Sequence, residues 1–302
     1  MLGSNNMLTN RPLILDFDGA LRDLSGAEVL PFADWQEVVR FGCGLGTWRK
    51  LRQEFADRLP ASHGTVLLGS GDFHHLTHLL VERLSREPRF DVVVCDNHPD
   101  NMRFPFGIHC GSWVRHVAAL PQVRRVHVVG ITSADIGWRH AWENHLWSLY
   151  AGKLRYWSVG VDTGWARLLG LAAGFSSHAD KTALVDAFIE AISADDTPVY
   201  LSIDKDVLAS HVARTNWDQG CFDLPDLQRL IEGLSGRLIG SDITGDVSIH
   251  RYRTWWKRWL SALDAQPAID EAELSRWQAQ QGEVNIQLLA WIAAATGDRA
   301  SR

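Results

Sequence analysis

Cysteine is scarce in this chain, and its four cysteines lie far apart. Cys43, Cys95, Cys110 and Cys221 form no C-x-x-C pair among 302 residues. This spacing argues against a zinc ribbon and against a disulfide scaffold, and it favours a reducing compartment.

Long apolar runs and an excess of basic residues are also missing. No segment approaches the roughly 18 uninterrupted apolar residues of a membrane span, and residues 1–12 lack the basic and apolar regions of a secretory leader. The net charge is −6, and the 30 Lys and Arg residues are scattered. We therefore expect a cytoplasmic protein whose partners include neither a membrane nor nucleic acid.

The composition that remains is typical of a globular enzyme, with 46% hydrophobic and 22% charged residues. Strand-like and helix-like segments alternate without a linker, which predicts one α/β domain over residues 1–302 with a helical C-terminal extension from about residue 251. The expected sheet is doubly wound and mostly parallel, with helices on both faces. Strands are expected near residues 13–15, 65–68, 92–95, 126–131, 155–161, 199–203 and 237–240. Helices are expected near 32–60, 112–120, 139–149 and 180–192, from Pro225 to the closing Gly236, and from about residue 251.

The most informative stretch follows the apolar run 92–95. Asp96, His98 and Asp100 alternate with other residues, so in an extended chain their side chains project to one side. Two carboxylates so close repel each other unless a cation lies between them. A divalent metal ion is the simplest resolution, and the alternative is a solvated polar turn at the strand end.

Other strands end in the same way. Asp204 and Asp206 follow strand 199–203, and a glycine turn after strand 65–68 leads to His74 and His75, of which one is the expected ligand. Because ligands bind outside the carboxyl ends of parallel strands, these groups are expected to converge. They provide enough ligands for two ions.

Two readings compete with a metal hydrolase. Asp16 and Asp18 form a D-x-D-G turn similar to the nucleophile motif of haloacid-dehalogenase-type phosphatases, but Ala20 stands where that motif has Thr or Ser. That reading also leaves the other acidic and histidine groups unexplained. The second alternative is a non-catalytic binding protein.

Two further segments are expected to be irregular. Residues 42–46, which are rich in glycine, are expected to be a flexible connection, and His109 is expected in a loop.

The pattern resembles the ureohydrolase superfamily of arginases, agmatinases and formiminoglutamases over residues 65–246. The D-x-H-x-D motif of that family matches residues 96–100, its S-x-D-x-D motif matches 202–206, and residues 71–74 resemble its G-D-H element with one residue inserted. The resemblance implies a three-layer arginase-like fold and two Mn²⁺ ions per chain. The implied metal ligands are His74 or His75, Asp96, His98, Asp100, Asp204 and Asp206.

The resemblance also implies roles around the metals. His109 and Asp100 would protonate the departing amine. Asp242 heads a D-x-x-E element whose glutamate binds the guanidinium group, but Gly245 stands in place of that glutamate, and Asp246, one position later, is the expected substitute.

The implied reaction is attack of a metal-bridging hydroxide on a guanidino carbon, which releases urea and an amine. Free arginine, agmatine, another guanidino compound and an arginine-containing peptide, converted to ornithine, all stay open as substrates. A formimino or amide substrate is the alternative within the same mechanism. The oligomeric state stays open. Tryptophans such as Trp255, Trp256 and Trp259 are expected to pack either in the core or at the interface of a homo-oligomer.

Overall fold

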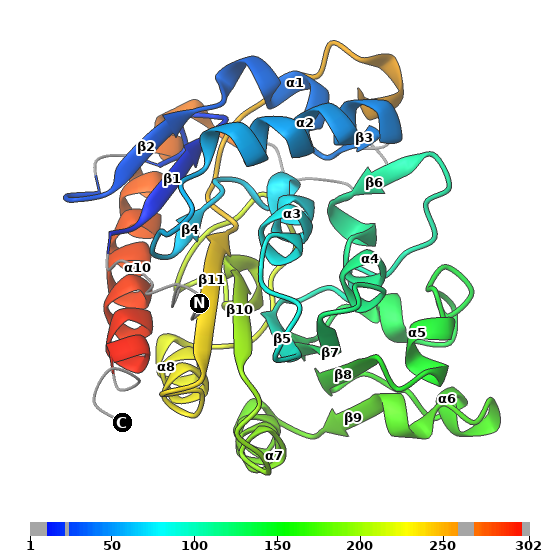
Figure 1. Cartoon of the computed structure of the whole chain (residues 1–302). Coiled ribbons are helices and arrows are strands. Elements are labelled where there is room, and N and C mark those ends of the chain that lie inside the picture. Colours follow the sequence, from blue (N-terminus) through cyan, green and yellow to red (C-terminus); the bar gives the residue numbers. More distant parts are fainter. Residues whose placement is uncertain (1–10, 22–23, 259–268, 298–302) are drawn as a thin grey trace.

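A nine-stranded parallel sheet forms the centre of the computed structural model, which describes residues 11–21, 24–258 and 269–297 (Figure 1). The strand order is β2-β1-β4-β11-β10-β5-β7-β8-β9. The strands are β1 (Leu13–Asp16), β2 (Glu28–Pro31), β4 (Val66–Leu67), β5 (Phe90–Cys95), β7 (Val123–Ile131), β8 (Leu154–Val159), β9 (Phe175–His178), β10 (Val199–Asp204) and β11 (Leu238–Thr244).

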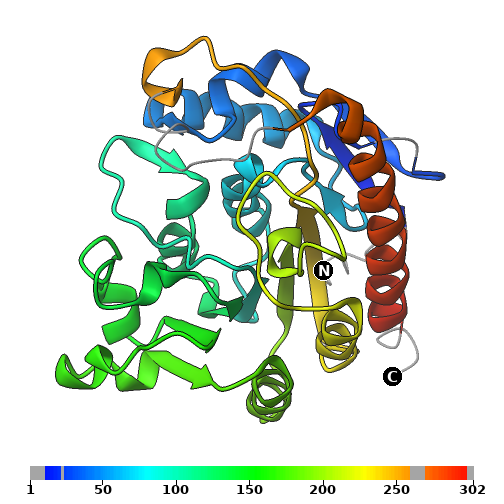
Figure 2. The ribbon, with the colours of Figure 1, turned by 180° about the vertical axis from the view of Figure 1, so that it is seen from behind.

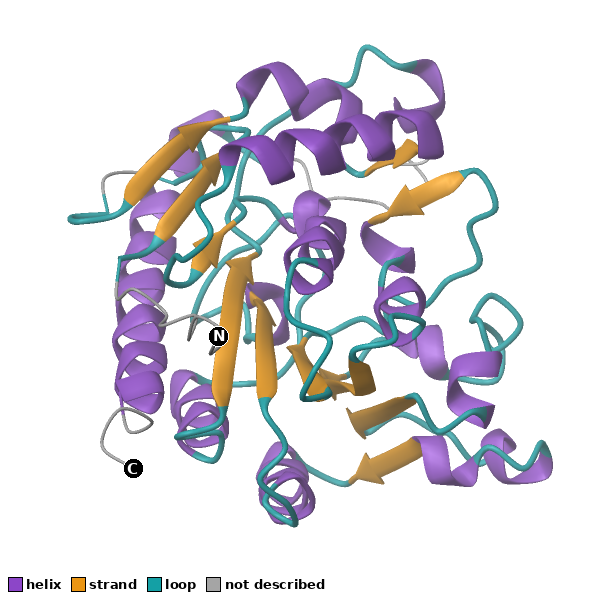
Figure 3. Ribbon diagram, in the orientation of Figure 1, coloured by secondary structure: helices purple, strands orange, loops and turns teal. Residues whose placement is uncertain are grey.

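Helices cover both faces of this sheet, as Figure 3 shows, and the whole is one domain. The α-helices are α1 (Gln36–Val39), α2 (Leu45–Arg58), α3 (Thr77–Glu82), α4 (Val114–Ala118), α5 (Trp147–Tyr150), α6 (Trp165–Leu168), α7 (Lys181–Ile192), α8 (Leu224–Glu232) and α10 (Glu271–Gly297). None of the described helices combines the length and the apolar character that a membrane span needs.

Alternation along the strands divides the core into two layers. In β5, Val92 and Val94 pack into the core that includes α2, α3 and α4, whereas Val93 and Cys95 pack into the core formed with α7, α8 and α10. This is the period of two that a strand buried on both faces requires. The prediction of a doubly wound parallel sheet is confirmed.

The C-terminal helix α10 belongs to the second layer. Val284, Leu288 and Ile292 are buried against the sheet, and the helix contacts α8 and β11. Seen from behind in Figure 2, α10 runs beside α8. The preceding segment, which was expected to be helical and includes Trp259, lies partly outside the described residues.

Several predicted boundaries were wrong. The expected helix 32–60 is divided into α1 and α2 by a short strand, β3 (Gly42–Gly44), which pairs antiparallel with β6 (Gly107–His109). The expected flexible connection and the expected histidine loop are therefore the two strands of one ribbon. The expected helix 139–149 is reduced to α5, and β11 continues beyond Gly240 as far as Thr244.

Glycine is required at the start of β3. A Cβ atom at Gly42 would lie 2.4 Å from the Cβ of His109, which is its partner in the ribbon. Only a residue without a side chain lets the two backbones approach this closely.

Candidate metal centre

The predicted ligands meet because β10 lies between β5 and β11. Ile203 of β10 is opposite Cys95 of β5, so Asp204 and Asp96 stand next to each other at the ends of adjacent strands. The histidine comes from a 3₁₀ turn, Gly71–Leu76, which follows β4 on the other side of β11. All of these segments end at the carboxyl edge of the sheet, as the sequence predicted.

His74 is at the centre of one group of ligand atoms. Its Nδ1 atom lies 3.2 Å from Asp96 Oδ2, 3.3 Å from Asp100 Oδ2 and 3.4 Å from Asp204 Oδ2. These side chains are buried, and the group His74, Asp96 and Asp100 has the spacing of a metal site.

His98 is at the centre of the second group. Its Nδ1 atom lies 2.9 Å from Asp206 Oδ2 and 3.6 Å from Asp96 Oδ1. The group Asp96, His98 and Asp206 also has the spacing of a metal site, and it shares Asp96 with the first. The carboxylate of Asp96 is therefore placed to bridge the two groups.

The two histidines proposed as metal ligands, His74 and His75, differ in their surroundings. His75 packs against Trp48, with ring centroids 5.8 Å apart, and belongs to neither group. Burial lowers the pKa of His75 well below its ordinary value, as do His109 and Lys257. His75 is therefore a neutral packing residue, and of the two histidines only His74 belongs to a group with the spacing of a metal site.

Asp242 supports the site from behind and does not line the cavity. Ser202 Oγ lies 2.9 Å from His74 Nε2 and donates to Asp242 Oδ1 at 2.8 Å. Thr77 and Tyr200 also donate to this carboxylate, at 3.0 and 2.7 Å. With Ser202 Oγ–H committed to Asp242, the pairing of Ser202 with His74 needs a proton on Nε2. Nδ1, which faces the carboxylates, is then the nitrogen left to bind a metal ion, as in a histidine whose other ring nitrogen is held by a hydrogen bond.

Asp100 is held in an uncommon conformation. Its φ is +44°, and Trp113 Nε1–H donates to its Oδ2 at 2.7 Å. Burial and the charge of Asp96 raise the pKa of Asp100 to about 7. A backbone strained in this way is found mostly at functional sites.

The balance of charge fits two divalent cations. Four carboxylates, those of Asp96, Asp100, Asp204 and Asp206, surround the two imidazoles, and their four negative charges equal the charge of two M²⁺ ions. Burial and the neighbouring carboxylates together raise the pKa of Asp206 to about 7 and that of Asp204 well above its ordinary value. His74 Nδ1 and Asp96 Oδ2 are buried without a hydrogen-bond partner. A cation between these atoms would remove both penalties, and oxygen with imidazole nitrogen suits Mn²⁺.

A cavity of about 590 Å³ opens above these groups. His109 lines it, and its Nδ1 accepts a hydrogen bond from Gly111 N–H at 3.0 Å. Burial, together with the charges of Arg115 and His116, lowers the pKa of His109 to about 3, so the ring is neutral and its Nε2 carries the proton. The structure thus brings His109 to the same cavity as the metal-ligand groups.

Asp246 is placed differently. Lys205 Nζ donates to its Oδ1 at 2.5 Å and Asn285 Nδ2 donates at 3.0 Å, and the residue does not line the cavity. Gly245 has φ of +89°, and a Cβ atom there would lie 2.4 Å from Asp204 Oδ1. No side chain fits at Gly245, and the carboxylate one position later is engaged in the core.

Asp16 and Asp18, the residues of the phosphatase alternative, do not line the cavity either. Asp16 Oδ1 accepts from Gly19 N–H at 2.9 Å, and Asp18 Oδ2 accepts from Ser248 Oγ–H at 2.6 Å. Both carboxylates are used within the structure.

Phe41, Trp217 and Asp218 are among the cavity residues that sequence reasoning missed. Asp218 Oδ1 lies 2.8 Å from His98 Nε2, and Asp218 Oδ2 accepts from Asn97 Nδ2–H at 3.2 Å. Residues 215–220 form a loop more than 100 positions from residue 98, so their place in the chain gives no sign of the contact. The only sign of a functional role in the sequence of that loop was the adjacent Trp217 and Asp218.

The comparisons with known proteins identify the family of the chain. The model of the arginase family matches residues 19–245, and the chain belongs to that family. An uncharacterized protein of Thermotoga maritima is 28% identical over 237 residues, which are 77% of this chain and 78% of that protein.

Solved structures show the same fold at low identity. The agmatine ureohydrolase of Thermoplasma volcanium has a TM-score of 0.53 at 17% identity. The match covers 99% of this chain and 93% of the ureohydrolase. The arginase of Bacillus subtilis has a TM-score of 0.52 at 15% identity, and the match covers 93% of this chain and 98% of the arginase. The chain is therefore a divergent member of the arginase family, whose enzymes hydrolyse guanidino C–N bonds, and the phosphatase alternative falls away.

Proposed function

We propose that this protein is a hydrolase that uses two Mn²⁺ ions to cleave a C–N bond of a linear amidine, with a guanidino compound as the substrate. The observation that carries the proposal is the convergence of four buried carboxylates and two imidazoles beneath one cavity. His74, Asp96, Asp100 and Asp204 would hold one ion, and Asp96, His98, Asp204 and Asp206 the other. Two bound divalent ions would supply a nucleophilic water at neutral pH, because such ions lower the pKa of water from 15.7 to about 7.

The side chains around the cavity provide the proton transfers. Asp100 lines the cavity beside His74, so its carboxylate is placed to take up and return a proton. Neutral His109 carries its proton on Nε2, since Nδ1 accepts from Gly111. We assign to His109 a hydrogen bond to the nitrogen that departs, and to Asp100 the transfer of the proton.

The substrate class follows from what the cavity contains. Planar cationic groups suit an acidic cavity, so arginine, agmatine and related guanidino compounds are the first candidates, together with an arginine-containing peptide that would become ornithine-containing. The absence of any side chain at Gly245 favours a second candidate, a formimino compound, because its smaller head does not need a carboxylate on that side.

A screen with Mn²⁺-loaded protein tests the proposal. Release of urea is measured with arginine, agmatine, guanidino acids and arginine-containing peptides, and release of formamide or ammonia with formimino compounds. We expect one guanidino compound to yield urea. Cleavage of a formimino compound alone would contradict the guanidino assignment and retain the metal site. A metal-loaded protein that hydrolyses neither class would favour a binding protein.

A further inference from the structure

Phe41 and Trp217 form one side of the cavity, which we call the aromatic wall. The ring of Phe41 is nearly parallel to that of Trp217, at 6.2 Å and 18°, and to that of His109, at 6.0 Å and 10°. Trp217 in turn meets His98 edge to face, at 6.1 Å and 69°. The wall therefore extends from His109 to a residue of the metal-ligand groups.

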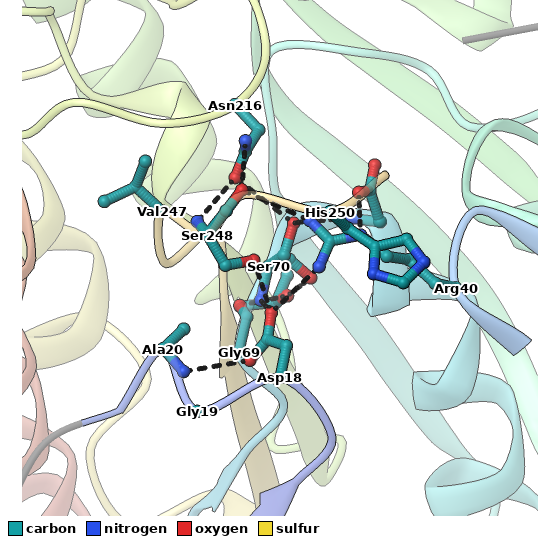
Figure 4. Close-up of polar contacts among 12 residues, drawn as sticks. Asp18, Gly19, Ala20, Arg40, Gly69, Ser70, Asn216, Val247, Ser248 and His250 are labelled. Atoms are coloured by element: carbon teal, nitrogen blue, oxygen red, sulfur yellow. Dashed lines mark hydrogen bonds and ion pairs between the residues drawn. The ribbon is translucent and has the colours of Figure 1, made fainter. Parts of the chain in front are cut away.

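One buried polar network joins the residues that precede the two rings, and Figure 4 shows its members Arg40, Ser70 and Asn216. Arg40 directly precedes Phe41, and Asn216 directly precedes Trp217. Arg40 Nη2 donates to Ser70 Oγ at 3.2 Å, and Ser70 Oγ donates to Asn216 Oδ1 at 3.3 Å. The backbones that carry the two rings are thus joined through a single hydroxyl group.

The same network is anchored at further points. Asn216 Nδ2 donates to the carbonyl oxygen of Ser248 at 2.8 Å, and Asn216 Oδ1 accepts from Ser248 N–H at 3.0 Å. The Asn216 side chain thus makes two hydrogen bonds to the backbone of one residue. The buried guanidinium of Arg40 is paired with Asp72 at 2.6 Å and Asp18 at 3.4 Å. Burying so many polar groups is costly unless all are satisfied, and a satisfied network is rigid.

Phe41 is held in a strained conformation. Its φ of +68° is rare for a residue with a side chain. Its N–H donates to Asp72 O at 2.9 Å, and its carbonyl oxygen accepts from Cys110 N–H at 2.9 Å. A residue kept in this region by its surroundings indicates a function for the direction of its side chain.

The spacing of the rings limits how a substrate can use them. A planar group between two rings needs about 3.5 Å on each side, or about 7 Å in all, and Phe41 and Trp217 are 6.2 Å apart. A substrate therefore cannot enter between them and must lie across the wall. Aromatic faces carry negative charge density and attract planar cations more than neutral isosteres.

We propose that Phe41 and Trp217 determine specificity by stacking the planar cationic head of the substrate. The inference rests on the proposed function and names the recognition element that Gly245 and Asp246 do not supply. The wall would select amidinium and guanidinium groups over neutral ureas and amides and hold their plane beside His109.

The test compares butylguanidinium with its neutral isostere butylurea. Affinities are measured by isothermal titration calorimetry on the Mn²⁺-loaded full chain, and the ligands are analysed afterwards for hydrolysis. If butylguanidinium is cleaved during the titration, its KM from urea release replaces the affinity. The wild-type protein should prefer the cation, and Trp217→Leu should reduce that preference about tenfold, the size of one desolvated cation–π contact.

Two further variants control the result. Trp147→Leu removes a tryptophan that is 73% exposed and does not line the cavity, and it should keep the preference. Trp217→Phe keeps a ring and should keep most of the preference, but the change in tryptophan fluorescence on binding should disappear. If Trp217→Leu does not fold, this loss of signal in Trp217→Phe decides the question.

The failures of the two proposals are distinguishable. A preference for the cation that depends on Trp217, without release of urea from any compound, would support the wall and contradict the catalytic proposal. Urea release with a preference unchanged in Trp217→Leu, or fluorescence changes retained in Trp217→Phe, would overturn the wall. Equal binding of both ligands by the wild-type protein would also overturn it.

Discussion

At the scale of single residues, Asp96 is the side chain on which both groups of ligands depend. Its Oδ2 faces His74 at 3.2 Å and its Oδ1 faces His98 at 3.6 Å. We predict that Asp96→Asn, which keeps the size but removes the charge, reduces bound manganese below about one ion per chain and abolishes turnover. Metal analysis by mass spectrometry and the urea assay check this.

The matched control is Asp16→Asn. Asp16 lies outside the cavity and accepts only a local hydrogen bond from Gly19 N–H among the described contacts. It should retain full metal content and activity. A loss of turnover in Asp16→Asn equal to that in Asp96→Asn would contradict the assignment.

Asp218 orients a ligand without belonging to either metal group. Its side chain is 70% exposed, yet it lies 2.8 Å from His98 Nε2 and fixes that ring. Removal of such an outer partner typically costs a factor of about 10–100 in metal affinity, so Asp218→Asn should raise the manganese concentration for half-maximal activity by that factor. Asp186→Asn, on the exposed surface of α7, should not. Equal effects in the two variants would show that general charge, and not the contact with His98, is responsible.

At the scale of elements, the ribbon of β3 and β6 brings His109 to the cavity. We predict that Gly42→Ala destabilises the protein by about 1–3 kcal/mol, the usual cost of overpacking, because the new Cβ would lie 2.4 Å from that of His109. Activity should fall beyond the loss of folded protein, since His109 must shift. Urea denaturation and the kcat of the folded fraction measure the two effects.

Gly46 gives the matched comparison. It lies in α2 with no atom within 4 Å of its ideal Cβ position, so Gly46→Ala should be neutral or stabilising by up to about 1 kcal/mol. Equal stability of the two alanine variants would contradict the close approach of Gly42 to His109 in the ribbon.

The same ribbon shows where sequence reasoning succeeded and where it failed. Short β-branched runs such as 92–95 and 199–203 identified the central strands, because burial on both faces leaves a continuous apolar pattern. The ligands followed from the fold rule that strand ends converge. The ribbon was missed because Gly42–Gly44 has a single side chain, that of Cys43, and so shows no period of two. The roles of Asp218 and Trp217 depend on contacts across more than 100 residues, which no local pattern contains.

At the scale of the whole molecule, a buried charge joins the C-terminal helix to the metal-ligand loop. Lys205 lies between two ligands in the sequence, and its Nζ donates to Asp246 at 2.5 Å and to Asn285 of α10 at 2.8 Å. We predict that Lys205→Met destabilises the protein by about 3–5 kcal/mol, because it leaves the carboxylate of Asp246 buried without a counter-charge. Urea denaturation measures the change.

Lys181 provides the control for that substitution. It pairs with Asp223 and Asp226 near the surface, so Lys181→Met should cost only about 0–1 kcal/mol. A cost for Lys205→Met as small as that of the control would mean that α10 is not anchored through this lysine.

The stability of the metal-free protein should fall as pH rises from about 7 to 8. Burial opposes protonation of His74 and His98, but the surrounding carboxylates raise the pKa of both well above the ordinary value of 6.5. A group with a raised folded pKa stabilises the protein below its unfolded pKa, and this contribution is lost as pH rises through the folded pKa. Buried histidines such as His78, whose pKa burial lowers to about 3, act in the opposite sense only below 6.5.

Manganese should remove this dependence, since bound cations replace the protons. Thermal unfolding of the metal-free and loaded proteins across this range checks the prediction. A metal-free protein that becomes more stable between about pH 7 and 8 would contradict it.

The account as a whole depends on two metal ions held at the carboxyl edge of the sheet. The most direct measurement is anomalous scattering at the manganese absorption edge from crystals grown with Mn²⁺. We predict two peaks, one among His74, Asp96 and Asp100 and one among Asp96, His98 and Asp206, and the loss of both in Asp96→Asn. A wild-type map without a peak at either group, or with manganese bound only elsewhere on the protein, would contradict the account.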